Sequence, residues 1–151
     1  MILDEIDFKI LKILKNKAKL PIKDISQKIG LSTTPVFERI KRMEQFKIIK
    51  GYTVVLDRNK VGRSLRVLCQ ISLKEHSKEA IELFETEVMK LEDVNECLHI
   101  AGNYDYLLAI EMKDVNAYER FLKEKLSVLS NISNVNSSFV LASVVDNGLV
   151  I

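Results

Sequence analysis

The chain has 151 residues, of which 47% are hydrophobic and 29% charged, with a formal net charge of +2 at neutral pH. This composition predicts a globular protein, and its apolar runs are too short and too often interrupted by charge for a membrane span. The first residues, MILDEIDFKI, carry acids where a signal peptide carries a basic segment, so we expect a cytoplasmic protein. Length alone allows either one ordinary domain or two small ones.

The charge is divided unevenly along the chain. Residues 1–60 hold eleven Lys and three Arg against seven acids, a balance of +7, whereas residues 61–151 have a balance of −5. A basic N-terminal unit is typical of a nucleic-acid-binding protein, because Lys and Arg displace counterions from phosphates. Solvated lysine-rich helix faces produce the same excess, so charge alone does not decide the function.

The first part of the chain predicts three short helices. Asp4 is the expected N-cap of the first helix, the second is expected to run from Pro21 to Gly30, and the third to follow the N-cap Ser32. The short connection between the second and third helices is typical of a helix-turn-helix. The run IIKGYTVVL, residues 48–56, is rich in β-branched residues and predicts a wing or connecting strand.

The second part predicts a separate α+β domain. Residues 57–62 are polar and end in glycine, so they form the expected linker between domains at 1–62 and 63–151. The period of the apolar residues predicts strands at 65–73, 94–101, 104–112 and 135–145, with two helices capped by Ser77 and Asp114. This βαββαβ order is that of a ferredoxin-like (ACT-like) domain, in which both helices cover one face of an antiparallel sheet. Because several strands are apolar on both faces, we expect a second copy of the chain to cover the other face, giving a homodimer.

Few residues carry the chemistry of a catalytic or metal site. Cys69 and Cys97 lie in apolar alternating runs and form no CxxC pair, so we expect two buried free thiols and no metal site. His99 is expected to be a packed residue of its strand rather than a pH switch or ligand. No phosphate-binding loop, catalytic triad or metal-ligand spacing is present in the sequence, so we expect neither an enzyme nor a cofactor.

The stretch KLPIKDISQKIGLSTTPVFERIKRME carries the strongest functional pattern. In a helix-turn-helix the second helix enters the major groove and presents side chains near its N-terminus to base edges. The expected DNA-contacting residues are Ser32, Thr33, Thr34, Phe37, Glu38, Arg39, Lys41 and Arg42. Threonine hydroxyls and methyls suit base edges, and the basic side chains suit phosphates or guanine. The alternative is an ordinary three-helix unit in which Ser and Thr only cap a helix.

Four motifs follow one another over nearly the whole chain: LDEIDFKILKIL, IGLSTTPVFERIKRME, IIKGYTVVLD and AGNYDYLL. In these motifs the chain resembles the Lrp/AsnC family of leucine-responsive and feast/famine regulators. The resemblance implies a winged helix-turn-helix that binds double-stranded DNA, followed by a ligand-sensing module. It also implies dimers that pair their sheets, often octamers built from four dimers, and an amino-acid effector bound between dimers.

The resemblance also implies where the effector binds. It assigns the pocket to a turn and to part of the last strand, at Gly102, Asn103, Tyr104, Asp105, Tyr106, Ser137 and Ser138. Chemically, Gly102 lets the backbone approach a ligand closely and Asp105 is able to accept a hydrogen bond from an ammonium group. Family members often carry an acid where this chain has Asn103. The alternative is that Gly102 and Asn103 only form a hairpin turn and that the two tyrosines pack.

Two other functional classes compete with a regulator. Sirohaem decarboxylases also resemble this family, but they need basic residues around the carboxylates of a bound tetrapyrrole, and the second domain has an acidic balance. A lone sensor module leaves the basic N-terminal helices unexplained. The sequence therefore favours a DNA-binding regulator.

Overall fold

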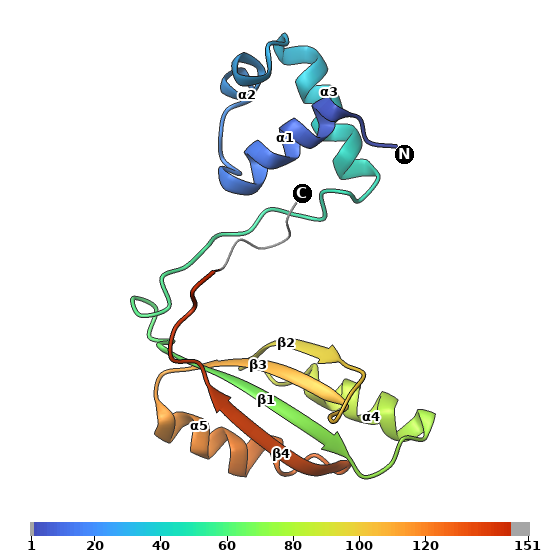
Figure 1. Ribbon diagram of the computed structural model, residues 1–151, viewed down its shortest axis with the longest axis vertical. Helices are drawn as coiled ribbons and strands as arrows, with labels where there is room; N and C mark the ends of the chain where they lie inside the picture. Colours follow the sequence, from blue (N-terminus) through green and yellow to red (C-terminus); the bar gives the residue numbers. More distant parts are fainter. Residues whose placement is uncertain (1, 146–151) are drawn as a thin grey trace. The chain divides into compact units, whose positions relative to one another are not determined.

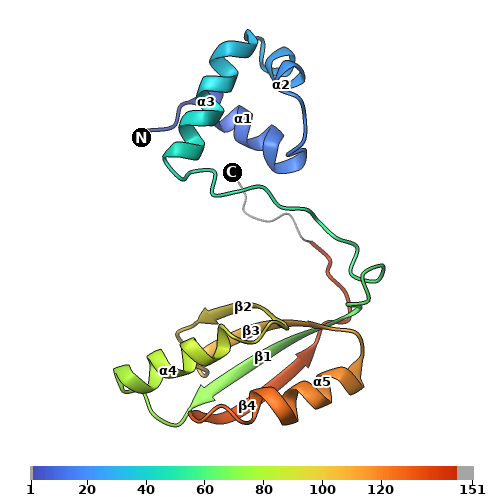
Figure 2. The same ribbon diagram turned by 180° about the vertical axis from the view of Figure 1, so that it is seen from behind.

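The computed structural model describes residues 2–145, which form two compact units, one within residues 2–55 and the other over Leu56–Val145. The first unit is helical and the second contains a sheet (Figures 1 and 2). Residues 56–62 of the first expected domain cluster with the second unit. Residues 146–151 of the second expected domain lie outside the described residues. No helix within residues 2–145 is long and apolar enough to span a membrane.

The first unit consists of three helices, α1 (Glu5–Asn16), α2 (Ile22–Ile29) and α3 (Thr33–Gln45). One buried cluster holds them together, and within α1 and α3 its members recur every three or four residues: Ile10 and Leu14, Ile25 of α2, and Val36, Ile40 and Met43. This spacing places the buried side chains on one face of each helix and leaves the opposite face to solvent. The predicted helix-turn-helix is therefore confirmed.

The helix ends follow from local chemistry. Asp4 caps α1 by accepting from the backbone N–H groups of Ile6 and Asp7, both at 2.9 Å, and Asp7 accepts in return from the Asp4 N–H at 3.2 Å. Pro21, the predicted first residue of α2, is its N-cap, so the helix begins one residue later than predicted, at Ile22. Gly30 ends α2 with a φ of +74°, a left-handed conformation that glycine adopts without the steric cost that other residues incur.

The strand predicted at 48–56 is not present. Residues 50–57 have no regular secondary structure, and the apolar side chains of Val54, Val55 and Leu56 are exposed. A strand requires a neighbouring backbone to complete its hydrogen bonds, and none of the four described strands lies in or pairs with this segment. The expected linker 57–62 folds into a turn that ends at Gly62, whose φ is +72°.

The second unit has the predicted βαββαβ order: β1 (Leu65–Leu73), α4 (Lys78–Val88), β2 (Val94–His99), β3 (Tyr106–Met112), α5 (Val115–Phe121) and β4 (Ile132–Phe139). The strands pair antiparallel in the order β2-β3-β1-β4. Both helices lie on one face of the sheet (Figures 1 and 2). The α+β, ferredoxin-like prediction is confirmed.

Three boundaries in this unit differ from the prediction. A wider turn, residues 100–105, separates β2 from β3 in place of a tight turn at 102–103. The predicted second helix, whose apolar stripe reaches Leu126, is α-helical only as far as Phe121 and ends in a short π-helical segment, η1 (Leu122–Leu126). β4 begins and ends earlier than the predicted 135–145, because β1 starts at Leu65 and the last bond to it runs from the Val140 N–H to the Arg66 carbonyl at 2.9 Å.

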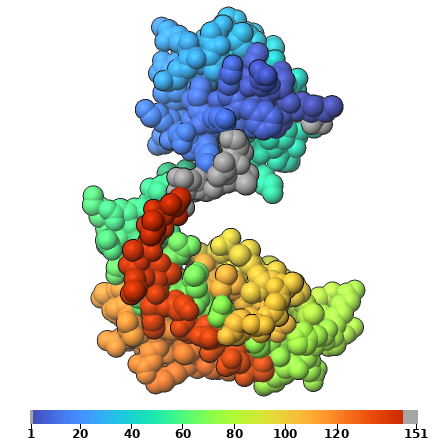
Figure 3. Space-filling model, in the orientation of Figure 1, coloured from blue at the N-terminus to red at the C-terminus, as the bar shows by residue number. Residues whose placement is uncertain are grey.

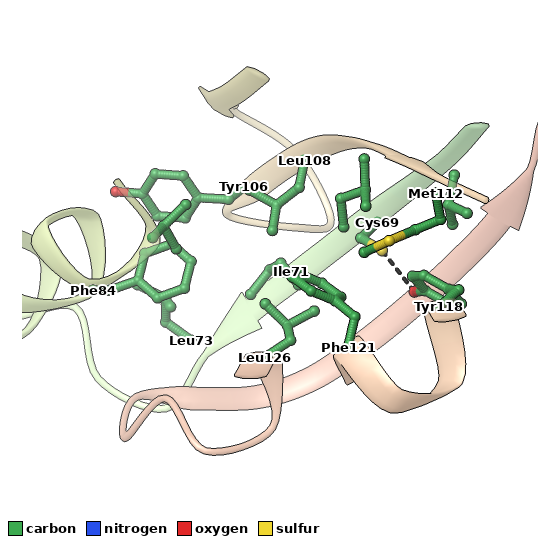
Figure 4. Close-up of a cluster of buried hydrophobic side chains, with 13 residues drawn as sticks. Cys69, Ile71, Leu73, Phe84, Tyr106, Leu108, Met112, Tyr118, Phe121 and Leu126 are labelled. Atoms are coloured by element: carbon green, nitrogen blue, oxygen red, sulfur yellow. Dashed lines mark hydrogen bonds between the residues drawn. The ribbon is translucent and has the colours of Figure 1, made fainter. Parts of the chain in front are cut away.

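The core of the second unit lies between the sheet and its helices (Figure 4). Alternate residues of β1 and β3 point into it, among them Cys69, Ile71, Tyr106 and Leu108, and Phe84 of α4 packs against them. Such alternation is what a strand with one covered face requires. The second set of strand residues faces the other side of the sheet.

No described helix of the second unit covers that other side, which we call the open face. Register places Leu68, Leu98, Leu107 and Ala109 next to one another on it, between Gln70 and Asn136 on one side and acids on the other. In Figure 3 the green, yellow and red atoms of the strands reach the surface on this side. The open face thus combines an apolar centre with a polar surround.

Candidate functional site

The exposed face of α3 carries most of the residues predicted to contact DNA. Because Val36, Ile40 and Met43 point into the core, the opposite side chains face solvent. The exposed members of the predicted set are Ser32, Thr33, Thr34, Phe37, Glu38, Lys41 and Arg42. Ser32 is the N-cap of α3, yet its hydroxyl makes no capping hydrogen bond in the described structure. Its hydroxyl and the N-terminal N–H groups of α3 suit an anionic group such as a phosphate.

Arg39, the remaining residue of the predicted set, is only partly exposed, because two acids at the start of α1 hold its guanidinium. Its guanidinium donates to Asp4 Oδ2 and to Asp7 Oδ1, both at 2.7 Å. Arg42 Nη2 lies 3.3 Å from Asp7 Oδ2, and its side chain is still about half exposed. Asp7 itself has no exposed surface, so both arginines compensate a buried carboxylate.

This cluster of Asp4, Asp7, Arg39 and Arg42 joins the start of α1 to α3, and the sequence analysis did not find it. The backbone N–H of Asp7 and the guanidinium of Arg39 together lower the pKa of the Asp4 carboxyl. A signal was present in the sequence. Two acids three residues apart in the first turn of one helix, and two arginines three residues apart in another, each share a helix face.

The segment after α3 is attached to that helix by one side chain. The hydroxyl of Tyr52 donates to Glu44 Oε1 at 2.7 Å. Burial, with help from the Glu44 carboxylate, raises the pKa of Tyr52 to about 12. Tyr52 and Phe37 both border a groove of about 360 Å³ over the core of the first unit. Phe37, predicted to contact DNA, therefore lies on the exposed face of α3 and also borders this groove.

The turn predicted to form the effector site is centred on Asp105. Asp105 Oδ2 accepts from the Leu73 N–H at 2.7 Å, and Oδ1 lies 2.8 Å from His76 Nε2. These contacts lower the pKa of the Asp105 carboxyl, the Leu73 N–H being the largest cause, so the group is ionised at neutral pH. Asp105 was predicted to bind the ammonium group of an effector, and the structure instead shows both of its oxygens engaged within the chain.

Other predicted effector residues lie on opposite sides of the sheet. Tyr104 is on the open face, where its hydroxyl accepts from Asn136 Nδ2 at 3.0 Å, and Ser138 is paired with Leu68 on the same face. Ser137 points to the helix side, where its hydroxyl lies 2.6 Å from that of Tyr118. The structure therefore does not bring Ser137 and Ser138 to one site, as alternation along a strand requires.

Tyr106 is a core residue with a polar end. Its ring is buried and lies 4.7 Å from the Phe84 ring and 4.5 Å from the His99 ring, to which it is stacked. Its hydroxyl donates to Glu85 Oε1 at 2.7 Å, and burial raises the pKa of Tyr106. The prediction that His99 packs is confirmed. These residues border a groove of about 460 Å³ between α4 and β2, which also includes Cys97.

Gly102 and Asn103 are exposed at the tip of the turn. Gly102 has a φ of +149°, which side-chain-bearing residues rarely adopt, and no atom lies within 4 Å of where a Cβ would stand. Space next to the Gly102 backbone is therefore open to a ligand.

The two cysteines differ in their surroundings. Cys69 is buried, as predicted, with its sulfur 2.8 Å from the Tyr118 hydroxyl (Figure 4). Burial raises the pKa of the Cys69 thiol. Cys97 is exposed, so the prediction that it is buried is wrong, because β2 is an edge strand with open groove on its helix side. Within residues 2–145 no three His, Cys, Asp or Glu side chains are grouped so as to hold a metal ion.

Comparison with known families assigns both units. Residues 3–50 match the model of a winged helix-turn-helix DNA-binding domain, and residues 66–150 match that of the Lrp/AsnC ligand-binding domain. The chain belongs to the Lrp/AsnC family. It is a DNA-binding transcriptional regulator of that type, as the sequence predicted.

Relatives match nearly the whole of this Lrp/AsnC chain. The proline dehydrogenase transcriptional activator of Rhizobium radiobacter is 36% identical, with 97% of this chain and 94% of the relative covered. The leucine-responsive regulatory protein of Escherichia coli is also 36% identical, with 94% and 87% covered. The structure of a transcriptional regulator from Neisseria meningitidis in complex with L-Met is 30% identical and has a TM-score of 0.92, with 96% and 94% covered. These relatives are transcriptional regulators.

Proposed function

We propose that this regulator reads double-stranded DNA through the exposed face of α3 and that an amino acid controls its binding. The observation that carries the DNA-binding part is the arrangement of α3, whose apolar side holds the core while Thr33, Thr34 and Lys41 face solvent. Hydroxyls and a cation at the start of an exposed helix fit base edges and phosphates in a major groove. The contact set comprises Ser32, Thr33, Thr34, Phe37, Glu38, Lys41 and Arg42, without Arg39.

We place the effector on the open-face side of the turn 100–105. Tyr104 and Ser138 lie on that side, the space beside Gly102 is open, Asn103 is exposed next to it, and the contacts of Asp105 hold the turn in place. Support for an amino acid comes from the match to a ligand-binding domain and from the relative that is bound to L-Met. Tyr106 and Ser137 contribute indirectly, because their side chains pack on the helix side of the sheet.

The proposal includes a homodimer that covers the open face. An apolar centre formed by Leu68, Leu98 and Leu107 is typical of a surface that meets a partner, and a second copy of the chain presents the same surface. A partner at this face stands next to the turn 100–105. We favour a regulator over the tetrapyrrole enzyme considered from the sequence, because relatives that match this chain over almost their full length are transcriptional regulators.

The experiment that tests this function is selection of bound fragments from genomic DNA with purified full-length protein, in the presence and absence of the twenty amino acids. We expect recovery of a common sequence with two related half-sites, and a change in recovery with at least one amino acid. Recovery of random fragments would contradict sequence-specific reading. Unchanged recovery, together with no heat of binding for any amino acid in calorimetry, would contradict the effector while leaving DNA reading intact.

A further inference from the structure

One residue ties the effector turn to the rest of the second unit. The backbone N–H of Asp105 donates to the Ile71 carbonyl at 2.9 Å, and its own carbonyl accepts from the Ile100 N–H at 2.9 Å. Its carboxylate accepts from the Leu73 N–H and contacts His76. Asp105 therefore connects both sides of the turn with the end of β1 and with the segment that follows β1.

Among these four contacts, only the one to His76 joins Asp105 to a side chain that is able to carry a positive charge. The other three partners are backbone groups, and the pKa of the Asp105 carboxyl is already lowered, chiefly by the Leu73 N–H. An imidazole normally changes its charge between about pH 5 and pH 8. His76 belongs to the segment between β1 and α4. A charge on its imidazole therefore affects the turn although His76 is not part of the turn.

Other charged groups near this contact do not replace His76. His99 attracts the Asp105 carboxylate, but it makes no hydrogen bond to it and its ring is stacked on Tyr106. Lys74 Nζ donates to the Ser130 carbonyl at 3.3 Å, away from Asp105. Glu75, next to His76, is exposed.

We propose that His76 is a positioning residue of the effector site, whose positive charge strengthens the hold on Asp105 and thereby orders the turn 100–105. Protonated His76 makes a charge-assisted contact, whereas neutral His76 retains at most a neutral hydrogen bond. The turn is thus held more tightly at the acidic end of the range, about pH 5 to pH 8, in which imidazoles change their charge. Because the His76 side chain is 61% exposed, solvent limits the effect to about two- to fivefold. The consequence for effector binding rests on the proposed function.

The first test follows the turn without any effector. Amide hydrogen exchange at Leu73 and Asp105 is measured by NMR between about pH 5 and pH 8, after correction for intrinsic exchange, in the full-length protein, His76→Gln and His99→Gln. Glutamine keeps a donor but cannot gain charge, and His99 is the only other histidine in the chain. We expect protection to fall about two- to fivefold with rising pH in the wild type and in His99→Gln, and to stay flat in His76→Gln. A flat wild type, or a pH dependence that is lost only in His99→Gln, would overturn the proposal.

The second test follows ligand binding, with L-methionine and L-leucine as probes in calorimetry. We expect affinity to weaken about two- to fivefold as pH rises in the wild type, and to be independent of pH in His76→Gln. Equal pH profiles in both proteins would overturn the role of His76 even though the effector binds. An absence of heat with every amino acid would instead refute the proposed effector, and the amide exchange would still decide whether His76 orders the turn.

Discussion

At the scale of single residues, Asp7 controls how the first unit is assembled. It has no exposed surface, and its carboxylate is shared by the Asp4 backbone, Arg39 and Arg42. A buried carboxylate that loses a charged partner keeps its desolvation cost without the compensating attraction. Arg39 therefore stabilises the first unit, whereas the exposed residues of the same helix are the proposed DNA contacts.

We predict that Arg39→Ala destabilises the protein by about 2 kcal/mol, because it removes a short charged hydrogen bond to a buried group. Lys41→Ala, on the exposed side of the same helix, is the control and should change the free energy of unfolding by less than about 0.5 kcal/mol. Urea unfolding followed by circular dichroism measures both. If the Arg39→Ala protein is as stable as the wild type but deficient in DNA binding, Arg39 contacts DNA and does not stabilise the fold.

A second prediction separates base reading from phosphate contact on α3. Thr34→Ala should reduce the ratio of operator affinity to random-DNA affinity about tenfold, because it removes a hydroxyl and a methyl from a base edge. Lys41→Ala should weaken binding to both DNAs and reduce the slope of log affinity against log salt by about one contact, or about 0.9. Fluorescence anisotropy over a salt series measures these quantities. If Thr34→Ala changes the salt slope and leaves the ratio unaltered, Thr34 contacts phosphate and not a base.

At the scale of elements, Asp93 joins three segments of the second unit. Its carboxylate accepts from Lys125 of η1 and from Arg63, which precedes β1, both at 2.9 Å. Lys125 first and Arg63 second lower the pKa of the Asp93 carboxyl. A carboxyl whose pKa is lowered on folding stabilises the fold above its unfolded pKa, near 4, and this stabilisation is lost as pH falls through the folded value.

We predict that Asp93→Asn costs about 1 kcal/mol at neutral pH, a value limited by the exposure of both cations. The difference from the wild type should shrink as the pH is lowered below about 4. Glu119→Gln, which breaks a solvent-exposed pair with Lys123 one helical turn away, is the matched control and should leave the free energy of unfolding nearly unchanged. Thermal unfolding across this pH range checks both. An Asp93→Asn deficit that persists unchanged in acid would mean that the contribution of Asp93 is not one of charge.

The elements also show what the sequence was able to predict. The helix caps and β1 were found with correct bounds, because capping chemistry and apolar alternation are local properties. The strand expected at 48–56 failed, since the β-branched pattern is local but pairing needs a second backbone. Similarly, β4 ends with the last residue that pairs with β1, Phe139 opposite Val67, a limit set by a strand some seventy positions away.

The contacts of the candidate sites were harder to predict from the sequence than the fold. The sequence located the exposed face of α3 but not the contacts of Arg39, because the buried acid that binds it lies on another helix. At the turn 100–105, the motif identified Asp105, but the sequence did not show its contacts within the chain. The Leu73 N–H that it accepts from is a backbone group more than thirty positions earlier, and no sequence pattern marks it.

At the scale of the whole molecule, the two units carry opposite charge balances and different exposed surfaces. The basic first unit suits DNA. The second unit has an apolar open face that none of its own described helices covers. A dimer that buries this face carries two α3 helices. A protein that contacts two half-sites at once binds DNA far more tightly than one that contacts a single half-site.

Our last prediction is that the open face holds the dimer and that separating the subunits weakens operator binding without unfolding either unit. Leu107 lies on this face between Gln70 and Leu98, and its side chain is not part of the core on the helix side. Leu107→Glu should therefore place a charge in the dimer interface and convert the protein to a monomer at micromolar concentration, as measured by light scattering. The control is Leu83→Glu on the exposed side of α4, where Leu83 is 49% exposed, and it should remain a dimer.

Because each recognition helix addresses one half-site, and half-sites lie about 34 Å or a multiple apart, the monomer should retain weak half-site binding and lose the gain from joint binding. Circular dichroism confirms that the sheet is intact in both variants. A Leu107→Glu protein that remains dimeric, or a wild type that is monomeric at micromolar concentration, would show that the open face does not join two copies of this chain.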